Sequence, residues 1–375
     1  NFNFFSDFTN ETDHLSLILF SVVGGLCLAS YTNFVMFFLG IEILSIPMYV
    51  LAGSNKRNLE SNEAALKYFL MGSFATGVML FGIVLIYGTT GTFDLYTMRM
   101  KVSSEGFVAT PMFTVGIVML MAAMAFKTAS APFHFWAPDV YSGSPTSVTA
   151  FMASFVKVAA FAALMRLFYT ALPSVPGAYP NLLLLLIIAS LFIGNIIAAY
   201  QTNTKRMLAY SSISHAGFLM MAILCFSNTQ SIHALFFYAA AYAITSLAAF
   251  MVLKIVGENG GGEDIASFQG LVKRNPLLAG TMTVAMLSMA GIPPVSGFFA
   301  KYYMLSLAIS NGYTWVAVIG ILASLVGVYY YFKVIIAMFS KQGEAEAIST
   351  SVLQKVILVV LNIAVIGMGL ISAIY

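Results

Sequence analysis

The stretch from 125 to 134 reads Ala125-Phe126-Lys127-Thr128-Ala129-Ser130-Ala131-Pro132-Phe133-His134, and it closes an apolar run that begins at residue 111. A lysine and a proline therefore interrupt a segment long enough to cross a lipid bilayer, which takes about 20 apolar residues. Proline removes a backbone donor and clashes with the preceding turn, so it frees carbonyl groups in a helix. In a membrane such groups persist only inside protein or beside a wet cavity. The stretch predicts a broken membrane-spanning helix with a lysine at its break.

The composition of the whole chain agrees with a membrane protein. Of its 375 residues, 60% are hydrophobic and 8% are charged, whereas soluble domains carry about 25% charged residues. A membrane β-strand needs only about ten alternating residues, and the apolar segments here are longer and more continuous. We therefore predict an all-α polytopic membrane protein. Its eleven expected spans lie near 15–32, 33–53, 61–88, 111–131, 145–171, 181–200, 205–226, 231–256, 276–307, 313–339 and 352–374.

Several classes of cofactor site have no signature in the sequence. The two cysteines, Cys27 and Cys225, lie far apart in apolar segments, so iron–sulfur and structural zinc sites are not expected. No dinucleotide-binding or P-loop motif occurs in a suitable context. The net charge of +3 is too small and dispersed to suggest nucleic-acid binding. We expect no cofactor bound by this chain.

Basic residues distinguish the two ends of the predicted helices. Loops that alternate along the chain carry eight Lys and Arg residues on one side and three on the other. By the positive-inside rule, the richer side faces the cytoplasm. The eight are Lys56, Arg57, Lys205, Arg206, Lys254, Lys273, Arg274 and Lys341, and the three are Arg99, Lys101 and Arg166. The acidic residues Asp7, Glu11 and Asp13 predict a loop over residues 1–14, and the absence of a basic segment before the first span argues against a signal peptide.

A second broken span and a faint internal match predict a repeat. The second break reads Gly291-Ile292-Pro293-Pro294-Val295-Ser296-Gly297-Phe298-Phe299-Ala300-Lys301. Paired interruptions in corresponding spans are typical of transporters built from repeats. Residues 65–69 resemble 234–238 at an offset of 169, and five spans separate them, which would invert one copy relative to the other. We expect a first repeat over 15–171, a second over 181–339, and a final helix over 352–374.

Six ionisable residues inside the predicted spans are the candidate functional residues. Such groups are costly in a bilayer, and they commonly mark proton or ion pathways. We expect a Glu42–Lys127 pair that loads protons, and we expect Lys157 and His215 to form a relay leading to Lys301. The alternatives are a neutral, hydrogen-bonded carboxyl at Glu42, static ion pairs that hold helices together, and a core histidine with satisfied hydrogen bonds. The sixth candidate, Lys67, lies near a span end, from which it could extend its ammonium to water.

At these residues the chain resembles the antiporter-like subunits of respiratory complex I, and among them subunit N. Three stretches carry the resemblance: 126–141, the segment Leu208-Ala209-Tyr210-Ser211-Ser212-Ile213-Ser214-His215, and the second break with Lys301. The reading Ala137-Pro138-Asp139-Val140-Tyr141 and a lysine at position 301 favour subunit N over its sister subunits. The match extends over essentially the whole chain.

The resemblance implies a fold of fourteen spans with inverted five-helix repeats, of which the eleven here correspond to the fourth through fourteenth. It implies a subunit without a redox site in the proton-translocating NADH–quinone oxidoreductase. By resemblance, Glu42 and Lys127 form a first half-channel, Lys157 and His215 a central axis, and Lys301 a second half-channel, while Lys67 falls where the family carries a lysine. The expected partners are the other membrane-arm subunits and the lipid of a bacterial inner membrane, without direct NADH binding. The alternatives are a cation/proton antiporter subunit, a membrane-bound hydrogenase subunit, or a structural scaffold.

Overall fold

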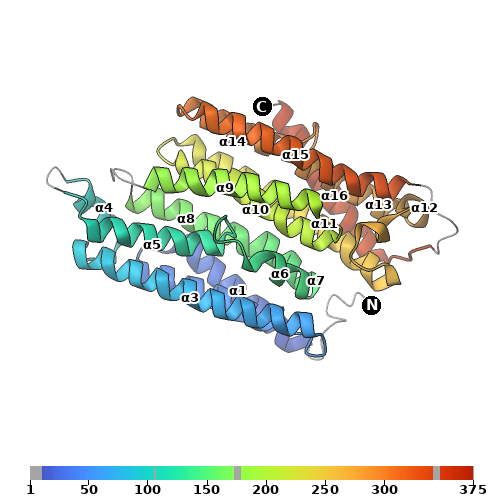
Figure 1. The fold of residues 1–375 in the computed structure, drawn as a ribbon, viewed down its shortest axis with the longest axis horizontal. Helices are drawn as coiled ribbons and strands as arrows, with labels where there is room; N and C mark the ends of the chain where they lie inside the picture. Colours follow the sequence, from blue (N-terminus) through green and yellow to red (C-terminus); the bar gives the residue numbers. More distant parts are fainter. Residues whose placement is uncertain (1–10, 105–106, 173–178, 341–346, 375) are drawn as a thin grey trace.

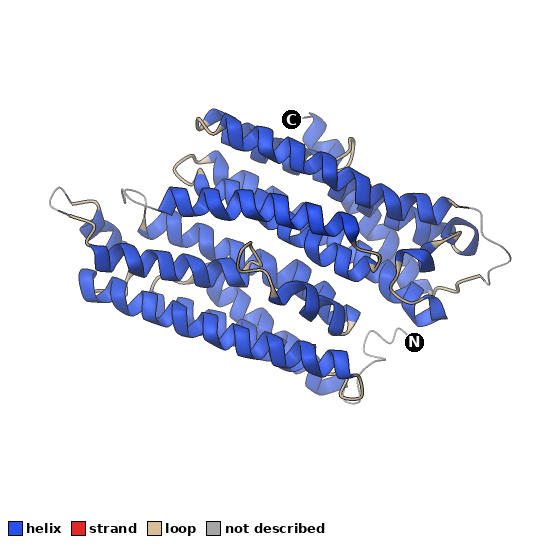
Figure 2. Ribbon diagram, in the orientation of Figure 1, coloured by secondary structure: helices blue, strands red, loops and turns tan. Residues whose placement is uncertain are grey.

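The computed structural model describes residues 11–104, 107–172, 179–340 and 347–374. Figure 1 shows long helices that run roughly side by side along the longest axis of the molecule, and Figure 2 shows that the described regular structure is helical. The earlier helices lie along one edge, α14–α16 lie along the other, and α9–α11 lie between them. The predicted all-α architecture is confirmed.

The helices fall into two series. The first comprises α1 Glu11–Ser30, α2 Phe34–Ala52, α3 Leu59–Thr90, α4 Leu95–Val102, α5 Pro111–Lys127, α6 Trp136–Gly143, α7 Thr146–Phe151, the π-helical η1 Met152–Val156 and α8 Lys157–Ala171. The second comprises α9 Tyr179–Tyr200, α10 Thr204–Leu224, α11 Gln230–Val256, η2 Gly257–Gly261, η3 Ile265–Phe268, α12 Leu271–Arg274, α13 Pro276–Ala290, α14 Ser296–Ser310 and α15 Thr314–Phe339, and α16 Val352–Ile374 follows.

The predicted spans correspond closely to these helices. Within the described ranges, nine helical segments are long and apolar enough to cross a membrane, and α5 and α13 are shorter apolar helices. These two short helices are the first halves of two broken spans, and α6 and α14 are their second halves. The predicted end of the first broken span at residue 131 was wrong, because α6 continues that span over Trp136–Gly143. Nine continuous and two broken spans make the predicted eleven. The predicted loop over 1–14 was wrong at its end, because α1 already begins at Glu11, while residues 1–10 lie outside the described part.

Local sequence explains where the helices that bear the site begin. Asn33 precedes α2, and its side chain accepts a hydrogen bond from the amide of Met36, while Asn203 does the same for α10 through Arg206. An asparagine at this position satisfies an amide that has no partner inside the helix. The broken spans begin with proline as their first helical residue, at Pro111 and at Pro276, where its missing amide proton costs nothing.

Two matching backbone contacts display the internal repeat. Asn33 forms an isolated β-bridge with Asp94, and Asn203 forms the same bridge with Asp264. Both members of the second bridge lie 170 residues after those of the first. The first bridge joins the starts of α2 and α4, and the second joins the starts of α10 and η3. Because α2 and α10 are the second and seventh spans, they run in opposite directions, as the predicted inverted repeat requires.

The two breaks end their first half-helices in different ways. After α5 the chain turns through Ala129, which has a positive φ of 55°, and after α13 it turns through Gly291 at 83°. Glycine adopts the second conformation without the steric cost that a side chain would add. A close approach follows at Gly297, where a Cβ atom would lie 1.8 Å from the carbonyl oxygen of Ser288. The second break therefore packs α14 directly against the backbone of α13.

Candidate proton-translocation site

Lys127 is the last residue of α5, and its side chain points into the protein. It is buried, and its Nζ donates hydrogen bonds to Ser45 Oγ at 2.7 Å and to Tyr49 Oη at 3.0 Å. Both hydroxyls belong to α2, and with Glu42 they follow the i, i+3, i+7 spacing of one helix face. The sequence therefore places a carboxyl group and two hydroxyl groups in one row along the helix that faces Lys127.

Glu42 does not form the direct ion pair with Lys127 that the sequence led us to expect. The ion pairs in the described part of the chain do not include it. Its Oε1 atom is buried and has no hydrogen-bond partner among the described residues. Lys127 instead donates to two hydroxyls farther along α2, those of Ser45 and Tyr49. Tyr49 was not predicted as a site residue, although its spacing from Glu42 was the available signal.

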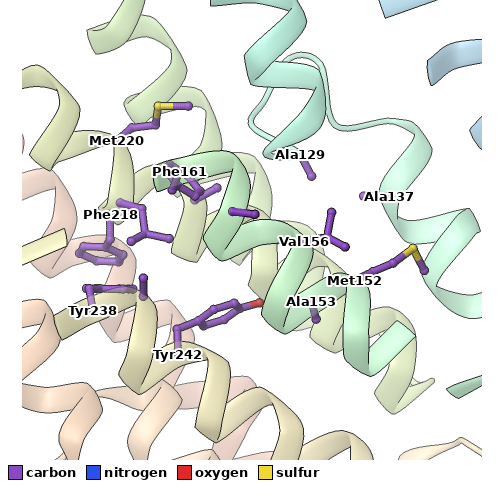
Figure 3. Close-up of a cluster of buried hydrophobic side chains, with 14 of the residues drawn as sticks. Ala129, Ala137, Met152, Ala153, Val156, Phe161, Phe218, Met220, Tyr238 and Tyr242 are labelled. Carbon is purple, nitrogen blue, oxygen red and sulfur yellow. The ribbon is translucent and has the colours of Figure 1, made fainter. Parts of the chain in front are cut away.

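Lys157 begins α8, directly after the π-helical segment η1. Its Nζ donates hydrogen bonds to the carbonyl oxygen of Ser212 and, at 3.1 Å, to Ser212 Oγ. The same atom lies 5.5 Å from the centre of the Tyr242 ring, within the range of a cation–π contact. Figure 3 shows Tyr242 reaching from α11 with its hydroxyl directed towards Ala153 of η1. A π-helical turn is rare and often marks a functional position, and Lys157 directly follows this one.

His215 on α10 is enclosed by tyrosines. Its Nδ1 is hydrogen-bonded to Tyr238 Oη at 2.8 Å and its Nε2 to Tyr331 Oη at 3.1 Å. Tyr331 is also hydrogen-bonded to Ser211, and the Tyr242 ring lies 4.7 Å from the imidazole. A tyrosine hydroxyl can both donate and accept, so the imidazole can hold a proton on either nitrogen. Sequence reasoning missed these tyrosines, which come from α11 and α15.

Lys301 lies in α14 and reaches back across the second break. Its Nζ donates to the carbonyl oxygen of Ala290, the last residue of α13, at 3.0 Å. A cavity of about 10 Å³ lies between this break and His215, and residues that line it include Tyr238, Thr245 and Ser288. That volume holds about one water molecule. The cavity therefore connects the histidine to the region of the second break.

Lys67 belongs to a different environment from the other candidates. Its side chain is 40% exposed, and its Nζ lies 2.7 Å from Glu63 and 2.7 Å from Asp139. Arg206 contacts the same Asp139 at 3.3 Å. Lys67 thus belongs to an ion-pair network that joins the N-terminal part of α3 to α6. The structure does not bring it together with the buried residues Lys127, Lys157, His215 and Lys301.

Comparison with known proteins places this geometry in a family. Residues 32–327 match the family model described as "NADH:quinone oxidoreductase/Mrp antiporter, TM". The chain belongs to this family. A relative from Cytophaga hutchinsonii named NADH-quinone oxidoreductase subunit N is 48% identical over 366 residues, which cover 96% of this chain and 78% of the relative. One of the same name from Trichlorobacter lovleyi is 42% identical over 90% of this chain and 69% of the relative.

Solved structures show the same fold. A chain of respiratory complex I from Thermus thermophilus superimposes with a TM-score of 0.85 and 35% identity, over 97% of this chain and 79% of that one. A chain of an archaeal membrane-bound sulfane sulfur reductase superimposes with a TM-score of 0.90 and 28% identity, over 100% and 75%. The protein is thus an antiporter-like, multi-pass membrane subunit of the NADH-quinone oxidoreductase type, related to subunit N.

Proposed function

We propose that this chain moves protons across the membrane through Glu42, Lys127, Lys157, His215 and Lys301, driven by electron transfer in other subunits. The chain itself would carry no redox centre and bind no cofactor or NADH. Its neighbours would be other membrane-arm subunits and the lipid of a bacterial inner membrane. Lys67, at the exposed end of α3, would act at most at the periphery of the pathway.

One observation carries this proposal: Lys127, Lys157 and Lys301 form no ion pair with an acidic residue in the described part of the chain. Lys127, Lys157 and Lys301 are each at most 8% exposed, and the ion pairs among the described residues involve none of them. Removing an ammonium group from water without pairing it is costly. A lysine kept only to hold helices together would be paired, whereas one surrounded by hydroxyls and carbonyls can give up its proton. The arrangement therefore favours proton transfer over a structural scaffold.

The energy needed is within reach of such groups. Moving one charge against 100 mV costs about 2.3 kcal/mol. One pKa unit corresponds to about 1.4 kcal/mol, so a change of one to two units in a lysine's proton affinity is sufficient. Movement of Glu42 relative to Lys127, or rearrangement of the hydroxyls that contact Lys127, would supply a change of that kind.

The test is proton pumping by the assembled complex in inverted membrane vesicles. Lys127→Ala and Lys301→Ala should lower the protons pumped per NADH oxidised while the subunit remains in the complex. Lys56→Ala, at an exposed loop position, is the control and should pump normally. Normal pumping in both interior variants would refute the proposal. A scaffold role would instead predict that the charge-neutral pair Glu42→Gln with Lys127→Met leaves pumping intact.

A second candidate is a cation/proton antiporter or a related membrane-complex subunit. The high TM-score to the sulfane sulfur reductase chain supports this second candidate. The sequence identity to the complex I chain is higher than that to the reductase chain, and it favours the first candidate, a proton-translocating subunit of NADH–quinone oxidoreductase. Pumping that requires sodium and is abolished by its removal would support the second candidate.

A further inference from the structure

A buried ion pair joins the two repeats at the end of the molecule where the basic loops lie. Lys205 on α10 is 3% exposed, and its Nζ lies 2.9 Å from Glu263 Oε1. The same Nζ donates to the carbonyl oxygen of Ser144 at 2.7 Å, and Thr146 Oγ1 donates to Glu263 Oε1 at 3.2 Å. The pair thus connects three places: the junction of α6 and α7, the start of α10, and the segment just before Asp264 of the second β-bridge.

The fold does not need this pair in order to form the bridge. In the first repeat, 170 residues earlier, Val35 stands in place of Lys205 and Phe93 in place of Glu263. The bridge between Asn33 and Asp94 forms there all the same. Replacing a buried ion pair by apolar residues is often neutral or stabilising. The architecture that the two repeats share therefore does not explain why the second repeat carries a buried ion pair at this position.

Three buried hydroxyl groups around the pair have no hydrogen-bond partner among the described residues. They are Ser144 Oγ, Ser147 Oγ and Thr204 Oγ1. The carbonyl oxygen of Ser144 accepts a hydrogen bond from Lys205. Thr204 precedes Lys205, and its backbone amide donates a hydrogen bond to the carbonyl oxygen of Glu263 at 2.8 Å. Ser147 directly follows Thr146 in the chain. Buried polar groups that lack a protein partner are normally satisfied by ordered water. Because Ser144 and Thr204 are bonded to the pair through their backbones, and Ser147 follows the Thr146 that contacts Glu263, these hydroxyls indicate a site that takes water.

Two rows of side chains lead from this place towards Lys157. On α10, Ser212 follows Thr204 by eight residues, a rise of about 12 Å. On the other side, Ser154 and Lys157 follow Ser147 by seven and ten residues along α7, η1 and α8. The rows meet where Lys157 donates its hydrogen bonds to Ser212. The water site and the interior lysine therefore lie along the same two helical segments, with Leu208 on one segment and Ala150 and Phe151 on the other between their polar side chains.

We propose that Ser144, Ser147 and Thr204 form a water-binding site covered by the Lys205–Glu263 ion pair, and that protons enter through it on their way to Lys157. The Glu263 side chain is 30% exposed, so the carboxylate end of the pair contacts solvent, whereas the Lys205 end is buried and separates solvent from the water site. The water site stands on the contacts described above. Its use as a proton entrance rests on the proposed function.

Cysteine accessibility in the assembled complex tests the water site without measuring pumping. Ser147→Cys, combined with Cys27→Ala and Cys225→Ala, is treated with a membrane-impermeant maleimide in vesicles of each orientation, and labelling is read by mass on the isolated subunit. Labelling should occur only from the side of the basic loops. Glu263→Gln should speed it by about tenfold or more, since the cover loses a charge-assisted hydrogen bond. Thr146→Val, which removes one bond to Glu263, should act in the same direction if Glu263→Gln fails to assemble.

Ser231→Cys is the control for general changes in the complex. The Ser231 hydroxyl is also buried without a hydrogen-bond partner among the described residues, but Ser231 lies near the start of α11, at the opposite end of α10 from the ion pair. Its labelling should not respond to Glu263→Gln. Labelling of Ser147→Cys from the opposite side, or none from either side with every cover variant, would overturn the water site.

Pumping then tests the entrance. Ser147→Ala and Thr204→Val should lower the protons pumped per NADH to the level of Lys157→Ala. If Ser147→Cys labels as expected but these variants pump like the native complex, the entrance role is refuted and the water site stands. If Lys157→Ala itself pumps normally, the proposed function has failed at Lys157.

Discussion

The ammonium of Lys301 donates to the carbonyl oxygen of Ala290 across the second break, although the two residues belong to different half-helices. Ala290 ends α13 as Lys127 ends α5. Each repeat therefore has a lysine associated with the end of its first half-helix: Lys127 is the terminal residue of α5, and Lys301 reaches the end of α13 from the following half-helix. A helix C-terminus carries about half a negative charge, which stabilises the protonated amine at both places.

Lys301→Arg separates the charge of this residue from its ability to release a proton. Arginine remains protonated in proteins and can still donate to Ala290. We expect the variant to assemble but to lose pumping as fully as Lys301→Ala, measured as protons per NADH in vesicles. Native pumping by the arginine variant would show that Lys301 serves as a fixed charge.

Gly297→Ala should damage the second break. The added Cβ would lie 1.8 Å from the carbonyl oxygen of Ser288, so α14 would have to move away from α13. Overpacking of this kind costs about 1–3 kcal/mol, and we expect less assembled complex and a lower temperature of dissociation. Gly280→Ala on α13 is the matched control, because a Cβ there meets nothing within 4 Å. Equal stability of the two variants would contradict the close packing seen at Gly297.

The parts of the site that the sequence predicted are those whose signal is local. A lysine or histidine inside an apolar run is visible without a structure, and so is the proline that breaks a span. The tyrosines Tyr49, Tyr238 and Tyr331 were missed because tyrosine is ordinary in a membrane helix. Their roles depend on which helices pack together.

Glu42 and Lys67 show the same limit for charged residues. The sequence indicates that each lies within an apolar run, but not how far along its helix the nearest partner sits. Lys127 donates to Ser45 and Tyr49 and forms no ion pair with Glu42. Lys67 pairs with Asp139, where α3 packs against α6. Such pairings follow from tertiary packing, which local patterns do not determine.

Asp94, in the loop between α3 and α4, should make the start of α4 sensitive to acid. Its carboxylate accepts hydrogen bonds from the amide and the hydroxyl of Thr97, both at 2.7 Å, and these lower its pKa below the ordinary 3.8. Because the pKa of Asp94 is lowered in the folded state, its ionised carboxylate stabilises the start of α4 above pH 3.8. This stabilisation is lost as the pH falls through the lowered pKa. Amide hydrogen exchange over Leu95–Val102, corrected for its intrinsic pH dependence, should accelerate there.

Asp94→Ala should show that faster exchange already at neutral pH. Asp264→Ala is the control, since Asp264 at the equivalent bridge position makes no side-chain cap to η3. Equal exchange over Leu95–Val102 in the native chain and in Asp94→Ala at neutral pH would argue against a role for the carboxylate.

Tyr331→Phe tests whether the hydroxyls around His215 carry protons. Among the described residues, the Tyr331 hydroxyl is the group that joins His215 Nε2 to Ser211, and phenylalanine keeps the ring and its packing. Removing it leaves the imidazole bonded to Tyr238 alone, so a proton arriving on Nε2 has no hydroxyl to continue through. We expect pumping to fall several-fold while NADH oxidation and assembly persist. A neighbour on the same helix, Tyr329, is 63% exposed, and Tyr329→Phe should pump normally. If both phenylalanine variants pump alike, the tyrosine is a packing residue and the route past His215 must run through Tyr238 and the cavity at the second break.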